Sequence, residues 1–331
     1  MTALDEQRTS IVALRLLFLG TGPLALPAFQ ALCDSHEHEV VGLVTQPDRT
    51  GRGHHQHLNP LKELANARGL SVLQPVSIKT PESVQALQQT QADLFVVAAY
   101  GQILSNAVLA VPRLGTINIH ASLLPKYRGA TPIHAAVLNG DQDAGVTIIE
   151  IVQKLDAGPM LGKAIIPVKS NETTGELEQR LAELAIPLTQ RVINEIETGT
   201  VERVSQDESL ATHVRKLSKS DGLIPWTKSA IEVERHVRGM QPWPGPFSHL
   251  HQPGKPPLRL QILAVLPQGD AETYSTNSPP GTVIAVTPET LTIRCGENAV
   301  QLLTLQPDGK RPMPAADFLR GRKVSVGDTL G

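Results

Sequence analysis

Hydrophobic residues in the first half of the chain gather in short continuous runs rather than in alternating patterns. Such a run is typical of a strand that is buried on both faces of a sheet. The runs cover residues 14–19, 40–45, 94–99, 116–120 and 146–152. Between them lie stretches with helical spacing, such as 81–91 and 133–138. Strands that alternate with helices predict crossover connections, and therefore a mainly parallel sheet with helices on both faces.

One longer helix is expected from Thr173 onwards, because Glu176 follows three residues later in a capping-box pattern. Leucines then recur at helical spacing and form one apolar stripe, which we interpret as core packing. They are Leu177, Leu181, Leu184 and Leu188. Pro187 is expected to bend or interrupt this helix, because proline lacks a backbone N–H.

The pattern changes from about residue 200. A polar stretch at 201–212 predicts a linker, and a short helix is expected around 233–240. Short β-rich segments follow at residues 258–266, 281–287, 291–295 and 299–305. Few short strands separated by turn residues favour a small OB-like β-barrel. We therefore predict an α/β fold, with a Rossmann-like domain in residues 1–200 and a barrel domain in residues 213–331.

Composition and charge narrow the possible classes of protein. The 331 residues have a net charge of −2, with 40% hydrophobic and 19% charged residues, as in a folded globular protein. The two cysteines, Cys33 and Cys295, form no CxxC pair, which argues against a disulfide framework and a thiolate zinc site. No apolar run approaches the ~20 residues of a membrane span, and Asp5 and Glu6 are unlike a signal peptide. A cytoplasmic protein is expected.

The two halves of the chain differ in charge. Residues 1–205 carry 16 Lys+Arg and 20 Asp+Glu, whereas residues 206–331 carry 14 and 12. The mild excess of positive charge permits contact between the second domain and nucleic acid.

The segment Gly20-Thr21-Gly22-Pro23-Leu24-Ala25 matches a dinucleotide-binding pattern, with Asp48 at the end of the next predicted strand. A pyrophosphate is held by free backbone N–H groups at the first helical turn. Pro23 removes one of these donors, and Pro27 suggests that the helix starts several residues later than a cofactor site needs. We therefore interpret the segment as a structural turn and expect no NAD.

Polar side chains that can do chemistry follow the predicted strand at 116–120. Asn118 and His120 are two residues apart, so they face the same side of the strand and can reach one atom between them. An amide and an imidazole that converge suit an oxyanion better than a metal. Asp156, on a turn after the next strand, is expected at the same end of the sheet, where its carboxylate would raise the pKa of His120.

These residues belong to three segments that closely resemble the 10-formyltetrahydrofolate-dependent formyltransferases. The segments are 118–125 (Asn-Ile-His-Ala-Ser-Leu-Leu-Pro), 127–133 (Tyr-Arg-Gly-Ala-Thr-Pro-Ile) and 155–158 (Leu-Asp-Ala-Gly). Further segments are similar to the members of this family whose acceptor is methionyl-tRNA. They are 46–49, 51–53, 217–219, 224–226, 241–245 with Arg238, and 305–310. The resemblance spans roughly residues 14–320.

The resemblance implies a formyl transfer from 10-formyltetrahydrofolate to the amino group of initiator methionyl-tRNA, carried out by a monomer without a metal. Asn118 and protonated His120 would stabilise the tetrahedral oxyanion, and Asp156 would orient His120 and relay the proton of the amine. The folate would lie against two segments of the first domain. The residues concerned are Ser122, Leu123, Leu124 and Pro125, with Ala99, Tyr100, Gly101 and Ile103.

The resemblance also implies tRNA contacts, from Arg49, Arg52 and Lys62 in or beside one loop and from Arg238 in the second domain. The loop departs from the usual pattern because histidines replace a commonly basic pair. The histidines of this loop are His54, His55 and His57. We interpret them as a solvated cluster rather than a metal site, since no acidic or thiol partner stands beside them.

Two other functions remain open from the residues. One is the same folate chemistry with an amino sugar nucleotide, glycinamide ribonucleotide or water as the acceptor. The other is a non-catalytic RNA-binding protein on the same scaffold, against which the intact Asn118, His120 and Asp156 set argues.

Overall fold

The computed structural model describes residues 13–48, 59–269 and 278–331, which form two compact units. The first unit contains the chain up to Arg128 together with Gly145–Ile165 and Glu178–Thr212. The second contains Gly129–Ala144, Ile166–Leu177 and His213–Gly331. Residues 201–212 therefore pack within the first unit, and the sequence-based domain bounds stay a prediction.

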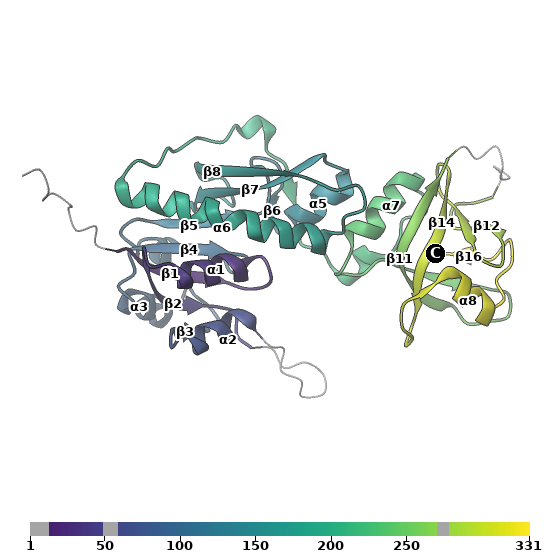
Figure 1. Cartoon of the computed structure of the whole chain (residues 1–331), viewed down its shortest axis with the longest axis horizontal. Coiled ribbons are helices and arrows are strands. Elements are labelled where there is room, and N and C mark those ends of the chain that lie inside the picture. Colours follow the sequence, from purple (N-terminus) through teal and green to yellow (C-terminus); the bar gives the residue numbers. More distant parts are fainter. Residues whose placement is uncertain (1–12, 49–58, 270–277) are drawn as a thin grey trace, which may run out of the picture. The chain divides into compact units, whose positions relative to one another are not determined.

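The first unit is built on a seven-stranded sheet (Figure 1). Its strands, in chain order, are β1 (Arg15–Gly20), β2 (Glu39–Val44), β3 (Ser71–Leu73), β4 (Leu94–Ala98), β5 (Thr116–His120), β7 (Asp143–Glu150) and β8 (Met160–Pro167). The spatial order is β3-β2-β1-β4-β5-β7-β8. The first five strands are parallel to their neighbours, and β7 runs antiparallel to β5. The predicted Rossmann-like, mainly parallel sheet is confirmed.

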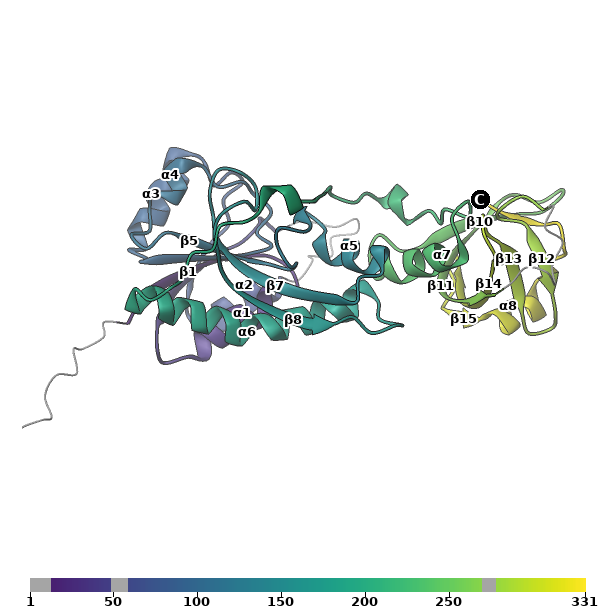
Figure 2. The same ribbon diagram turned by 90° about the horizontal axis from the view of Figure 1, so that it is seen from above.

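Helices cover both faces of this sheet, as Figures 1 and 2 show. Helices α1 (Ala25–Asp34) and α6 (Thr174–Thr198) lie on one face, and α3 (Pro81–Gln89) and α4 (Asn106–Leu109) on the other. Because both faces are covered, β1 has buried residues on both of its sides. On one side, Leu17 and Leu19 join a core with Leu87 and Val108. The phenylalanine of β1 instead meets Phe29 of α1. Helix α2 (Pro60–Ala67) follows β2.

The interruption of the helix, one of the two outcomes expected at Pro187, needs correction, and one strand was missed. Helix α6 runs through Pro187 without an interruption. Pro187 and Glu183 are both exposed, so water can reach the backbone carbonyl that lacks its N–H partner, while the buried leucines hold the helix on the sheet. Strand β8 was not predicted, because its residues alternate between exposed and more buried positions and form no continuous apolar run.

The second unit contains an antiparallel barrel. Its strands are β10 (Phe247–His251), β11 (Leu258–Gln268), β12 (Val283–Val286), β13 (Leu291–Arg294), β14 (Ala299–Pro307), β15 (Met313–Pro314) and β16 (Thr329–Leu330). The order is β12-β13-β14-β11-β10-β16, and the two ends meet through Val283 N donating to Asp328 O (2.8 Å) and Leu330 N to Gly281 O (2.7 Å). This confirms the predicted small barrel.

Helices accompany the barrel. They are α5 (Pro132–Asn139), α7 (Ala230–Gly239) and α8 (Ala315–Gly321). A capping box of Ser229 and Glu232 starts α7, which buries Val233 and Val237 in the barrel core. In the same core, Trp226 Nε1 donates to Ser248 Oγ (3.0 Å). The remaining short elements are β6 (Arg128–Gly129), β9 (His213–Val214), η1 (Glu208–Leu210) and η2 (Lys219–Gly222). Within the described ranges, no helix is both long and apolar enough to cross a membrane.

Candidate active site

Strand β5 presents Asn118 and His120 on one face. It pairs with β4 on one side and β7 on the other, with Asn118 opposite Val97 and Ile149. The residues that alternate with them, Ile117 and Ile119, are buried on the opposite face, as the period of a strand requires. Asn118 is half-buried, and its side-chain amide has no hydrogen bond to any residue that the structure describes. The amide is therefore available to a ligand.

The structure brings the imidazole and the carboxylate together as predicted. His120 Nδ1 lies 3.7 Å from Asp156 Oδ2, and the two side chains are only 6% and 10% exposed. The turn that carries Asp156 is tight: Asp156 has φ 49°, and a Cβ on Gly158 would lie 1.8 Å from the carbonyl oxygen of Glu150. A glycine is therefore required there to bring the Asp156 turn against the end of β7.

The hydrogen bonds of His120 define where its proton sits. Its Nε2 is 3.0 Å from the carbonyl oxygen of Tyr127, which can only accept, so Nε2 carries a proton. In the neutral ring Nδ1 is then unprotonated, and it faces the carboxyl group of Asp156. The two acceptors can share one additional proton. The His120–Asp156 pair can thus take up a proton from a reacting group.

Burial decides the charge state of His120. The carboxylate of Asp156 raises its pKa, as expected, and so does the carbonyl of Tyr127, but loss of hydration lowers it more, so the net pKa of His120 lies below its ordinary value. The expected effect of the Asp156 carboxylate is therefore present, but the loss of hydration, which the sequence did not reveal, outweighs it. Burial therefore favours the neutral imidazole in the resting protein, and the ring becomes charged when it gains a proton in the reaction.

The stability of the protein should therefore fall in mildly acidic solution. His120 and His236 of α7 are both buried, and burial lowers the pKa of each. Below pH 6.5 these histidines bind protons in the unfolded chain but not in the folded protein, which lowers the free energy of unfolding by up to about 1.4 kcal/mol per pH unit for each histidine. In thermal denaturation at pH 7.5, 6.5 and 5.5, the midpoint temperature should be lowest at pH 5.5. In His236→Gln the difference between the midpoints at pH 7.5 and 5.5 should be smaller. Equal midpoints at pH 7.5 and 5.5 would contradict the prediction.

The loop after β5 is held firmly from several sides. Thr147 Oγ1 donates to Ser122 O (2.7 Å) and accepts from Leu124 N (3.2 Å), and Lys163 Nζ donates to Leu124 O (2.5 Å). The side chains of Ser122 and Leu124 are buried, whereas Leu123 and Pro125 are half-buried. Folate contacts from Ser122 and Leu124 would have to use the backbone, and binding by all four residues stays a prediction.

The other segment predicted to contact folate follows β4. Ala99, Gly101 and Ile103 are exposed, and Ala99 and Gly101 both have positive φ (49° and 85°). Tyr100 is instead buried in the core beneath α3 and α4, and its carbonyl accepts from Gln46 Nε2 (2.8 Å). Three of the four residues are therefore accessible to a ligand, and their contact with folate stays a prediction.

The glycine segment at residues 20–25 forms a structural turn. Thr21 N donates to Ala98 O and Ala25 N to Gly22 O, each at 3.3 Å, so these N–H groups are already used within the protein. The helix nevertheless begins at Ala25, and the late start expected from Pro27 is wrong. Proline is tolerated in the first turn, where backbone N–H groups have no partner within the helix.

The residues predicted to contact tRNA lie in different surroundings. Arg49 and Arg52, together with the histidine cluster 54–57, lie outside the described residues. Lys62 Nζ pairs with Asp48 (2.5 Å) at the base of that loop. Arg238 is 14% exposed; it pairs with Glu234 and donates to the carbonyl of Glu172 (2.8 Å). Arg238 therefore has a structural role within the second unit, and its contact with RNA stays a prediction.

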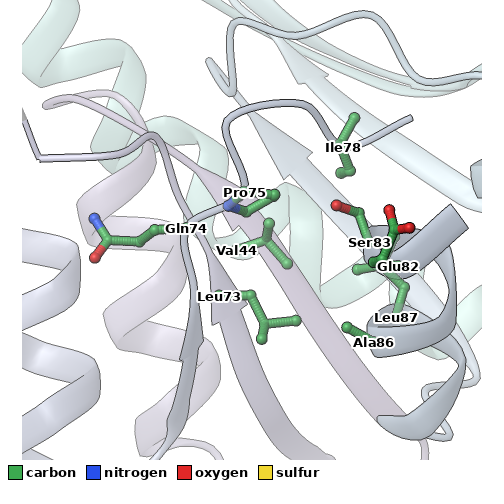
Figure 3. A pocket seen from close by; sticks show the side chains of 9 residues that line it. All are labelled: Val44, Leu73, Gln74, Pro75, Ile78, Glu82, Ser83, Ala86 and Leu87. Atoms are coloured by element: carbon green, nitrogen blue, oxygen red, sulfur yellow. The ribbon is translucent and has the colours of Figure 1, made fainter. Parts of the chain in front are cut away.

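A cavity of about 240 Å³ lies elsewhere in the first unit, between the ends of β2 and β3 and the start of α3 (Figure 3). Its walls are Val44, Leu73, Gln74, Pro75, Ile78, Glu82, Ser83, Ala86 and Leu87. Gln74 points away from the other side chains in Figure 3 and donates to Gln46 O and Asp48 Oδ1. None of the residues predicted for the site lines this cavity. In the described parts of the chain, no three His, Cys, Asp or Glu side chains are grouped to hold a metal ion.

Two residues near the site were missed by the sequence reasoning. Arg128, which is fully buried, and Gln206 together support the turn that carries Asp156. Arg128 lies inside one of the segments quoted above, but nothing in the pattern indicated its burial. Gln206 lies in the polar stretch that was predicted as a linker and carries no local signal of its contacts.

Comparison with known proteins agrees with this arrangement. Residues 14–193 match the model of the formyl transferase family, and residues 216–323 match that of the formyl transferase C-terminal domain. Methionyl-tRNA formyltransferase of Roseiflexus castenholzii is 40% identical over 321 residues, covering 97% of this chain and all of the relative. The enzyme of the same name from Pseudomonas syringae pv. tomato is 40% identical over 96% of this chain and 98% of its own.

Solved structures share the fold at low identity. HypX from Aquifex aeolicus, in complex with tetrahydrofolic acid, has a TM-score of 0.61 and is 19% identical to this chain. The match covers 96% of this chain and about half (51%) of the HypX chain. An N-formyltransferase from Helicobacter canadensis, in complex with folinic acid and dTDP-3-aminofucose, has a TM-score of 0.61 at 17% identity over 88% of this chain and 98% of its own. With both family models matched in order, the chain belongs to the formyl transferase family.

Proposed function

We propose that this protein transfers the formyl group of 10-formyltetrahydrofolate to the amino group of initiator methionyl-tRNA in the cytoplasm. The observation that carries this proposal is the 40% identity to methionyl-tRNA formyltransferases along both units of the chain. The available amide of Asn118 and the buried His120–Asp156 pair support it, because acyl transfer to an amine needs an oxyanion donor and a proton acceptor.

In this reaction a bond forms between the amine nitrogen and the formyl carbon, and the bond from that carbon to N10 of the folate breaks. Asn118 donates its amide N–H to the oxygen that becomes negative in the tetrahedral intermediate. The His120–Asp156 pair takes the proton that the attacking amine loses. Because His120 starts neutral, this uptake creates a positive charge beside the oxyanion only when the oxyanion has formed. The proton then passes to N10 of the leaving folate.

The identity of the acceptor is tested by incubating the protein with 10-formyltetrahydrofolate labelled in the formyl group and a panel of acceptors. The panel contains initiator methionyl-tRNA, an amino sugar nucleotide, glycinamide ribonucleotide and no acceptor. Label should enter methionyl-tRNA with the highest kcat/KM. Faster transfer to one of the small acceptors, or rapid release of formate when none is present, would overturn the proposal.

The segment from Asp48 to Lys62 is expected to contact the tRNA backbone. Replacing Arg52 by Ala should raise KM for methionyl-tRNA, while KM for the folate stays the same. A cation that neutralises one phosphate contributes about one unit to the slope of log affinity against log salt concentration, so the variant should show a slope lower by about 1. Kinetics measured over a salt series test this, with Arg113→Ala, at the exposed Asp93 pair, as the control. Identical slopes would remove the loop from the tRNA-binding surface.

A further inference from the structure

The polar stretch predicted as a linker lies against the walls of the candidate active site. Residues 203–212, here called the strap, follow α6 and pack within the first unit. At its start, Val204 and Met160 exchange two backbone hydrogen bonds (2.8 and 2.9 Å), and Arg203 pairs with Glu150 (2.7 Å). The strap is thus attached to the strands β7 and β8 on either side of the Asp156 turn.

Gln206 of the strap contacts the Asp156 turn directly. Its side-chain Nε2 donates to the backbone carbonyls of Asp156 (2.7 Å) and Gly158 (2.8 Å). One amide group therefore binds two carbonyls of the turn that positions the Asp156 carboxylate beside His120. Both N–H donors of the amide are used in this contact.

Arg128 fixes the orientation of that amide. The guanidinium is completely buried and donates from Nε (3.1 Å) and Nη2 (2.8 Å) to Gln206 Oε1. Because the guanidinium can only donate, the oxygen of the Gln206 amide must face it, and the nitrogen must face the two carbonyls. The other side of the guanidinium pairs with Glu208, which also binds Lys154 (2.6 Å). The contact between Gln206 and the turn is therefore anchored by a fully buried guanidinium.

The far end of the strap holds the other neighbour of His120. Thr212 Oγ1 accepts from Tyr127 N (2.8 Å), and the carbonyl of Tyr127 accepts from His120 Nε2. Tyr127 and Asp156 have φ values of 62° and 49°, which lie in the left-handed region that side chains other than glycine rarely adopt. Such conformations persist where surrounding contacts hold them. The strap supplies these contacts on both sides of the imidazole.

We propose that Gln206 is a positioning residue for formyl transfer, which holds the Asp156 carboxylate beside His120 through its two hydrogen bonds to the turn. This inference rests on the proposed function, since it assigns Gln206 a part in the same reaction. The strap thereby couples a segment outside the quoted family segments to the geometry of the catalytic pair. Groups that orient metal ligands typically cost about 10–100-fold in activity when they are replaced, and we expect a loss of the same size for a group that orients Asp156.

Two variants separate the role of the amide N–H groups from that of packing. Gln206→Glu keeps an oxygen for Arg128 but removes both donors to the turn, and Gln206→Met keeps the length of the side chain without polar atoms. Both should lower kcat for methionyl-tRNA by about 10–100-fold, with KM for both substrates changed less than twofold. Gln88→Glu and Gln88→Met, at an exposed position on α3, are the matched controls and should retain the activity of the unmodified protein.

An NMR titration of histidine-labelled protein gives a readout that needs no substrate, with the His120 signal assigned by its loss in His120→Asn. In Gln206→Met the pKa of His120 should be lower than in the unmodified protein, because a displaced Asp156 carboxylate supports the imidazolium less. Unchanged kcat in Gln206→Glu, or an unchanged His120 pKa in Gln206→Met, would overturn the inference. If the unmodified protein formylates no methionyl-tRNA while this pKa still falls, the proposed function fails and the positioning contact stands.

Discussion

Asn118→Ala is expected to lower kcat for methionyl-tRNA formylation by about 10²–10³-fold, the usual loss when one oxyanion donor is removed. The side-chain amide of Asn118 has no hydrogen bond to the described residues, so its removal leaves no buried partner without a bond. The thermal midpoint and KM for the folate should therefore change little. Steady-state kinetics combined with thermal denaturation measure all three quantities.

Controls for this prediction use the same substitution elsewhere and a near-isosteric change at the site. Asn106→Ala, at an exposed position in α4, should leave kcat unaltered. Asn118→Asp keeps the shape but exchanges the N–H donor for a negative charge, so it should be at least as slow as the alanine variant. If folate KM and kcat worsened by equal factors in Asn118→Ala, the residue would bind the ground state and the oxyanion role would be wrong.

Asp156→Asn is expected to lower kcat by about 10²–10⁴-fold, the range for loss of a group that transfers a proton. Asparagine adopts the left-handed conformation readily, so the turn at φ 49° should keep its shape. What the variant loses is the charge 3.7 Å from His120 Nδ1 and with it the second acceptor for the proton of the amine. Single-turnover kinetics, which report the chemical step rather than product release, are the suitable measurement.

A second carboxylate provides the control for the loss of charge. Asp34 is exposed at the end of α1, where it pairs with Arg68, so Asp34→Asn should retain full activity. In Asp156→Asn the pKa of His120 should fall further, because the neighbouring negative charge that raises it is gone. Retention of more than a tenth of the activity in Asp156→Asn would mean that the proton leaves by another route, such as water.

Much of the site could be predicted because its geometry is local. The two-residue period of a strand places Asn118 and His120 on one face wherever β5 lies in the sheet. The closeness of Asp156 to His120 could not be derived from strand order, because β7 runs antiparallel to β5 and ends at Glu150, opposite Ile117 near the start of β5. The segment after β7 brings the carboxylate of Asp156 back to 3.7 Å from His120 Nδ1, which only the tertiary structure shows. The buried runs predicted β1, β2, β4 and β5 for a similar reason, since burial on both faces of a sheet requires continuous apolar sequence.

The sequence by itself therefore determined the two kinds of sheet, the shared face of Asn118 and His120, and the family to which these residues point. Tertiary structure alone decided that His120 is neutral, that Arg128 is fully buried, and that the polar stretch after α6 supports the catalytic turn. Gln206 meets Asp156 across 50 positions of chain, and the hydration that His120 loses depends on every segment packed around it. Neither the contact of Gln206 nor the lost hydration of His120 is encoded in a local pattern, because both depend on contacts that exist only after the chain has folded.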